Sequence, residues 1–205
     1  GGGGYTSDDI RQLIPAEHIA FVDDILARYD VPPMPDGVAG GGYANRAGDA
    51  PFSANRASNQ LPIVFAHNPS LIANALGPPP AFMIDMAREH GRKVAALAGR
   101  PVHAERHIQA GVDLIIAQGS EAGGHTGEIG SMVLIPEIVD AAGDVPVLGA
   151  GGIGRGRQMA AAMALGAQGV WCGSVWLTTE EAETHPVVKQ KFLAATSADT
   201  IRSRS

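Results

Sequence analysis

A histidine in a glycine-rich segment is the clearest candidate for chemistry in this chain. Residues 118–127 read Gln-Gly-Ser-Glu-Ala-Gly-Gly-His-Thr-Gly, and the histidine is His125. The segment directly follows an apolar run, 112–117, that has strand character. In barrels of alternating strands and helices, chemistry takes place in the loops at the carboxyl ends of the strands. Because imidazole titrates near neutral pH, His125 is a candidate general base, although a loop histidine bonded to nearby backbone would explain the same residues.

Two further glycine clusters have the properties of a phosphate site. Gly151-Gly152 and Gly173-Ser174 close two successive apolar runs. Backbone N–H groups from both can converge on one phosphate where no Cβ blocks the approach. The standard phosphate site of (β/α)₈ barrels follows the last two strands in the same way. Tight turns alone would explain one such cluster, but two on consecutive strands favour phosphate binding, with Cys172 packed beside the loop.

Residues 149–154 also match the dinucleotide-binding pattern G-x-G-x-x-G between a strand and a helix. That interpretation needs an acidic residue about 20 positions later, at the end of the next strand, to hold a ribose hydroxyl. The region 170–174 reads Val-Trp-Cys-Gly-Ser and contains no acid. The sequence therefore disfavours a dinucleotide fold.

The elements that must position these residues alternate regularly in the second part of the chain. Continuous Val/Ile/Leu/Ala runs are typical of parallel strands that are buried on both faces. Their starts recur every 20–33 residues or so, about the length of a βα unit, so the fold class is α/β, either doubly wound or a barrel. Of two early apolar runs, 61–66 is assigned to a helix and 71–76 to a strand, because a Gly-Pro-Pro-Pro turn follows the second. The expected strands are 71–76, 93–98, 112–117, 145–149 and 169–175, and the expected helices are 16–29, 61–66, 80–90, 101–110, 134–142, 156–165 and 186–195.

Local signals support several of these helices. A proline near the start and a glycine just past the end are typical of helix boundaries. Three expected helices follow this rule, with Pro80 and Gly91, Pro101 and Gly111, and Pro136 and Gly143.

No metal site is expected among the histidines. His103 and His107 lie four residues apart on one helix face, but their order differs from the H-E-x-x-H pattern of zinc proteases. We interpret that face as solvated.

Composition limits the remaining function classes. The chain has 205 residues, 45% of them hydrophobic, which is enough for a folded core. Its formal net charge of −6 argues against nucleic acid as a partner, and its one cysteine excludes a disulfide framework. No apolar run reaches the roughly 18 residues of a membrane span, and no signal peptide is recognised, so we expect a cytoplasmic protein without a membrane partner.

The domain organisation is expected to be simple. We expect one domain over 1–205, with an irregular loop or excursion at 31–59. The chain begins with four glycines, lacks an initiator Met and stops at Arg-Ser-Arg-Ser, which suggests a fragment that is cut at both ends.

Three segments resemble the nitronate monooxygenase family, formerly called 2-nitropropane dioxygenases. They are Ala-Gln-Gly-Ser-Glu-Ala-Gly-Gly-His-Thr-Gly at 117–127, Pro-Val-Leu-Gly-Ala-Gly-Gly-Ile at 146–153, and Ala-Leu-Gly-Ala-Gln-Gly-Val-Trp-Cys-Gly-Ser at 164–174. The last two are similar to the family's final two strands with their phosphate loops. The resemblance runs from about Leu71 onward in matching order.

The resemblance implies an FMN-binding (β/α)₈ barrel. Three more strands precede the matched region in that family, so we expect an incomplete barrel with about the last five βα units. His125 would take the α-proton of a nitroalkane or orient the nitronate, and electrons would then pass through the flavin to dioxygen, giving a carbonyl compound and nitrite. The implied and candidate cofactor-binding residues are Gln118, Gly123, Gly151, Gly152, Cys172, Gly173 and Ser174.

Two alternatives stay open at this level. Relatives that act as NAD(P)H-dependent FMN reductases of enoyl thioesters or quinones carry nearly the same loop around His125. The chain could also be a phosphate-binding barrel fragment without activity of its own. The sequence does not decide whether the protein forms a homo-oligomer.

Overall fold

The computed structural model describes residues 13–32 and 54–203. The chain divides into two compact units, 1–67 and 68–205, and each is described by itself. The single domain expected over 1–205 stays a prediction. Most of the segment 31–59, expected to be irregular, lies outside the described residues.

The first unit contains two described helices. Helix α2 spans Ala16–Arg28, close to the expected 16–29, and Pro15 stands at its N-cap. Helix α3 spans Ala54–Ala66, which confirms the helical assignment of the run 61–66. It begins earlier than expected, inside the segment that the sequence assigned to an irregular loop.

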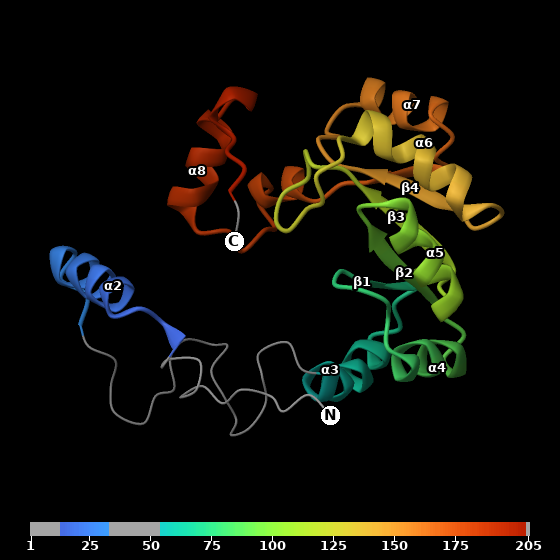
Figure 1. Cartoon of the computed structure of the whole chain (residues 1–205), viewed down its shortest axis with the longest axis horizontal. Coiled ribbons are helices and arrows are strands. Elements are labelled where there is room, and N and C mark those ends of the chain that lie inside the picture. Colours follow the sequence, from blue (N-terminus) through green and yellow to red (C-terminus); the bar gives the residue numbers. More distant parts are fainter. Residues whose placement is uncertain (1–12, 33–53, 204–205) are drawn as a thin grey trace. The chain divides into compact units, whose positions relative to one another are not determined.

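The second unit is built on a five-stranded parallel sheet with the strands in chain order. A doubly wound sheet reverses its strand order at one point and carries helices on both faces. Here the order has no reversal, and helices α4 to α7 lie along one face (Figure 1). This is the arrangement of part of a (β/α)₈ barrel. The strands are β1 Leu71–Asn74, β2 Lys93–Ala98, β3 Leu114–Gln118, β4 Val147–Ala150 and β5 Gly169–Trp171.

The two faces of the sheet have different roles. On the outer face, a Cβ built on Gly149 would lie 2.9 Å from Ile135 Cδ1, so helix α6 packs directly on strand β4. On the inner face, Ala95, Ile116 and Ala150 form a buried cluster. Leu71, Leu97 and Leu114 pack against that cluster. Burial on both faces explains why the strands read as continuous apolar runs.

The helices of this unit agree with the expected positions, with one early start. They are α4 Ala81–Glu89, α5 Pro101–Ala110, α6 Ser131–Ala142, α7 Gly156–Ala164 and α8 Pro186–Ala194. Pro80 is the N-cap of α4 and Pro101 is the first residue of α5, as the sequence predicts. Helix α6 begins at Ser131, so Pro136 lies inside it and does not mark its start.

The expected strand 169–175 is too long. Strand β5 ends at Trp171, and Ser174–Thr178 forms a 3₁₀ helix. The indole Nε1 of Trp176 donates a hydrogen bond to the Cys172 carbonyl oxygen at 2.9 Å. The backbone N–H of Trp176 donates to the Gly173 carbonyl oxygen at 3.0 Å. These two bonds turn the chain away from the sheet, so the apolar residues after Trp171 do not extend the strand.

Candidate active site

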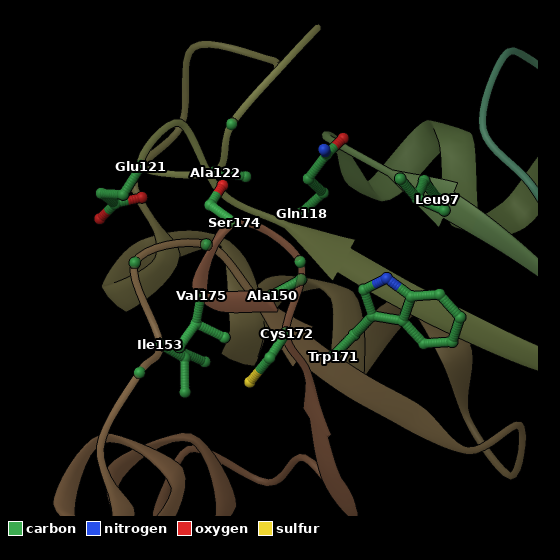
Figure 2. Close-up of a pocket in the computed structure, with 15 residues that line it drawn as sticks. Leu97, Gln118, Glu121, Ala122, Ala150, Ile153, Trp171, Cys172, Ser174 and Val175 are labelled. Atoms are coloured by element: carbon green, nitrogen blue, oxygen red, sulfur yellow. The ribbon is translucent and has the colours of Figure 1, made fainter. Parts of the chain in front are cut away.

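A pocket of about 370 Å³ lies at the carboxyl ends of β3, β4 and β5, and we call it the strand-end pocket. Figure 2 shows that its walls come from the ends of these strands and the loops that follow them. All seven residues that the sequence predicts for cofactor binding line it: Gln118, Gly123, Gly151, Gly152, Cys172, Gly173 and Ser174. The structure thus brings together three glycine clusters that are separated by up to about 50 residues in the chain.

Close backbone approaches shape the strand-end pocket. Gly151 has a φ of +113°, and a Cβ there would lie 2.6 Å from Ser131 Oγ. A Cβ on Gly123 would lie 2.5 Å from Ser174 Oγ. A side chain at either position would fill the space between the loops, so glycine keeps the backbone N–H groups accessible. Backbone N–H groups that stay accessible in this way would suit the phosphate of a nucleotide such as FMN.

Glu121 also lines the strand-end pocket, but its carboxylate is bound elsewhere. Its Oε2 accepts hydrogen bonds from the backbone N–H and from the hydroxyl of Ser131, both at 2.9 Å. Partial burial opposes ionisation of Glu121, but the hydrogen bonds from Ser131 outweigh it and lower the pKa of the carboxyl group. The negative charge is thereby held at the start of α6, where the helix dipole stabilises it.

Ser131 joins three segments of the site. Its hydroxyl lies within hydrogen-bond distance of Glu121 on the loop after β3, and of the carbonyl oxygens of Ala150 and Gly151 at the end of β4. The hydroxyl therefore ties the loop that carries His125 to the loop with Gly151 and Gly152. The unexpected start of α6 has the same origin, because Glu121 binds the free N–H of its first residue.

His125 does not line the strand-end pocket. It is exposed, makes no hydrogen bond to another described residue, and lines a second pocket of about 340 Å³, which we call the histidine pocket. Leu97 and Gln118 line both pockets, so the two are adjacent. The expected base thus lies beside the expected cofactor site, separated from it by the strand ends of β2 and β3.

The structure corrects the expectation that the face of α5 with His103 and His107 is solvated. His107 is only 2% exposed, and its Nε2 bonds to the Leu97 carbonyl oxygen at 2.9 Å. Because a carbonyl oxygen only accepts, Nε2 carries the proton. Nδ1 is buried without a partner among the described residues. Burial lowers the pKa of His107, the bond to Leu97 partly opposes this, and nearby His103 adds to the lowering.

Sequence reasoning missed the other eight residues that line the strand-end pocket, which are Leu97, Glu121, Ala122, Ala150, Ile153, Gly154, Trp171 and Val175. The available signal for Glu121 was its place within the glycine-rich segment 118–127 that follows a strand. The signal for Trp171 was its position at the end of an apolar run, directly before Cys172 and Gly173. The described residues contain no cluster of three metal-ligating side chains and no helix that is both long and apolar enough to cross a membrane.

A sequence profile of the family described as nitronate monooxygenase matches residues 41–204. The chain belongs to the nitronate monooxygenase family. A protein of Mycobacterium tuberculosis with a provisional monooxygenase name is 59% identical over 99% of this chain. An octahydroindene-carboxyl-CoA dehydrogenase of Rhodococcus jostii is 35% identical over 76% of it. The chain spans 53% and 45% of these two relatives, so it corresponds to about half of their length.

A solved structure supports the same family. The nitroalkane oxidase of Streptomyces ansochromogenes superposes with a TM-score of 0.61 and 32% sequence identity. The superposition covers 65% of this chain and 42% of that chain. The nitronate monooxygenase family thus accounts for the barrel-type sheet and for the glycine-rich loops at its strand ends.

Proposed function

We propose that this chain belongs to a flavin oxidoreductase that binds FMN and oxidises nitronates or nitroalkanes with dioxygen to a carbonyl compound and nitrite. One observation carries the proposal. The glycine clusters after β3, β4 and β5 line a single pocket, and His125 lines the pocket next to it. Overall, a nitronate and half a molecule of dioxygen give a carbonyl compound and a nitrite ion, so atoms and charge balance.

The residues of the strand-end pocket have distinct proposed roles. The backbone N–H groups of Gly151, Gly152, Gly173 and Ser174 would hold the FMN phosphate. Gln118 and Gly123 would line the flavin, and Cys172 would pack beside the phosphate loop. When bound, FMN supplies the redox chemistry, taking electrons from the substrate and passing them to dioxygen. The protein supplies binding and orientation.

His125 would act as the general base at the substrate. A neutral nitroalkane must lose its α-proton before it can be oxidised, whereas a nitronate has already lost it. The exposed imidazole of His125 is free of other described partners and can accept that proton at a ring nitrogen. Leu97 and Gln118, which line both pockets, would separate the proton-transfer site from the phosphate site.

Anaerobic mixing tests the proposal. The chain is loaded with FMN, and the flavin absorbance is followed after adding a preformed nitronate or NADH. The proposal predicts bleaching by the nitronate, followed by recovery and nitrite formation when dioxygen is admitted. Bleaching by NADH but not by the nitronate would contradict it.

A second candidate function is an NAD(P)H-dependent FMN reductase of enoyl thioesters or quinones. The observation that favours it is the 35% identity to a carboxyl-CoA dehydrogenase over 76% of this chain. The same experiment separates the two functions, because only the reductase predicts bleaching by NADH and reoxidation by a thioester or quinone under anaerobic conditions.

A further inference from the structure

Trp171 stands at a special position on the sheet. The strand register pairs Gln118 with Ala150 and Ala150 with Trp171. Neighbouring residues in register on parallel strands point to the same face, so these three side chains form one row across the carboxyl ends of β3, β4 and β5. Ala150 belongs to the buried cluster of the inner face, so the row lies on the face that is opposite the helices.

Leu97 shares this face. It pairs with Ile116, which precedes Gln118 by two residues and therefore points to the same side of the sheet. Figure 2 shows the Trp171 indole extending from the end of β5 toward the side of the strand-end pocket where Leu97 and Gln118 lie. The polar part of the pocket, with the glycine clusters, continues from the same strand ends. The pocket thus combines glycine-rich loops with an aromatic and aliphatic wall.

Trp171 is 38% exposed in the described structure, although Ala150 beside it in the row is buried. Its side chain forms no hydrogen bond to any other described residue. The second tryptophan of the chain, Trp176, differs from Trp171 in its hydrogen bonding and in its position. Its Nε1 is bonded to the Cys172 carbonyl oxygen, and it does not line the strand-end pocket. Only Trp171 therefore presents an indole to the pocket.

We infer that the indole of Trp171 lies against the isoalloxazine ring of FMN and positions that ring over the inner face of the sheet. The inference rests on the proposed function, because it requires FMN in the strand-end pocket. Trp171 is two residues before Gly173, so its side chain lies next to the phosphate cradle. The ribityl chain of FMN separates its phosphate from its ring, which takes the ring past the cradle and over the row that contains Trp171.

The size of the effect follows from the strength of aromatic pairs. In addition to the effect of burying its surface, an offset-stacked or edge-to-face aromatic pair typically changes an equilibrium constant by about 2- to 10-fold. Replacing Trp171 by Leu should therefore raise the dissociation constant of FMN by about this factor. Phe at the same position retains an aromatic ring and should recover most of the affinity.

The chain contains only two tryptophans, which makes a spectroscopic test specific. An indole in contact with an excited flavin donates an electron to it and quenches its emission, and this requires close contact. We would titrate FMN into the wild-type chain and into Trp171→Leu, Trp171→Phe and the control Trp176→Phe, and measure affinity and the emission of bound FMN. Circular dichroism and thermal unfolding of each variant report on folding.

The inference predicts that the fluorescence of bound FMN is strongly quenched in the wild-type chain and in Trp176→Phe. It predicts stronger fluorescence of bound FMN in both Trp171 variants, and weaker binding of FMN only in Trp171→Leu. Equal emission and equal affinity in all four proteins would overturn the inference while leaving the proposed function standing. If the wild-type chain binds no FMN, both proposals fail.

Discussion

The carboxylate of Glu121 holds the first residue of helix α6, Ser131, through its backbone N–H and its hydroxyl, both at 2.9 Å. The two residues are ten positions apart, and the loop between them carries His125. The bond closes this loop at its base. Because Ser131 also lies against the end of β4, the bond fixes the spacing of the loop relative to the glycines of the strand-end pocket.

Removing this carboxylate should destabilise the protein. Glu121→Ala leaves the first N–H of α6 without its cap, and loss of a helix cap typically costs about 1 kcal/mol of unfolding free energy. Glu121→Gln keeps one carbonyl acceptor and should cost less. Glu128→Ala is the matched control, because Glu128 lies on the same loop and has no described partner. Urea unfolding measures all three, and equal stability of the Glu121→Ala and Glu128→Ala variants would contradict the capping role.

The contribution of Glu121 should also depend on pH. Its hydrogen bonds to Ser131 lower the pKa in the folded state below the ordinary value of 4.5. A carboxyl group of this kind stabilises the fold above its unfolded pKa, and the stabilisation is lost as pH falls through the folded pKa. The stability difference between the wild-type chain and Glu121→Gln should therefore be largest at neutral pH and shrink below pH 4.5. Unfolding experiments over this range check the prediction, and a constant difference would refute it.

His107 should also make the stability of the fold depend on pH, in a higher pH range than Glu121 does. Burial lowers its pKa in the folded state below the ordinary value of 6.5. The unfolded chain therefore binds more protons between the two pKa values, so stability falls as pH drops from 6.5 through the folded pKa. His107→Gln cannot titrate in this range and should show a flatter stability profile. Urea unfolding at a series of pH values from 6.5 downward compares the wild-type chain with His107→Gln, and equal slopes would contradict the prediction.

Much of the fold was predictable because its signals are local. Strand β2 and helix α5 have the boundaries that the sequence predicts, since glycine and proline stand at their ends. The start of α6 was not predictable from local signals, because its cap comes from Glu121, ten residues upstream. The end of β5 was not predictable either, because Trp176 turns the chain by bonding back to Cys172.

The site was predictable to a similar degree. Glycine clusters at strand ends predicted the residues that line the strand-end pocket, because parallel strands bring their carboxyl ends together. The i, i+4 spacing of His103 and His107 shows that they share a face of α5. It does not reveal that His107 turns toward the sheet, where its Nε2 reaches the Leu97 carbonyl oxygen. The inward position of Trp171 depends on strand register, which a single sequence does not define.

Replacement of His125 should slow the oxidation of two substrates to different extents. His125→Asn keeps a polar side chain but removes the base, so oxidation of a neutral nitroalkane should slow by about 10²- to 10⁴-fold. Turnover of a preformed nitronate should change much less, because that substrate has no α-proton to lose. Steady-state rates of nitrite formation from both substrates make the comparison. Equal losses on the two would show that His125 does not act as the base.

The central claim is that the N–H groups of two neighbouring strand-end loops bind a flavin phosphate, and the preference for FMN over riboflavin tests it most directly. Riboflavin lacks the phosphate, and each hydrogen bond to a charged group typically contributes about 1.5–3 kcal/mol. The wild-type chain should therefore bind FMN at least about tenfold more tightly than riboflavin.

Gly173→Asp should abolish this preference, because the new carboxylate repels the phosphate. The substitution itself has room, since a Cβ at Gly173 meets no atom within 4 Å. The control Gly156→Asp has similar space and does not line the strand-end pocket, so it should keep the preference. Equal affinity of the wild-type chain for FMN and riboflavin would contradict the account.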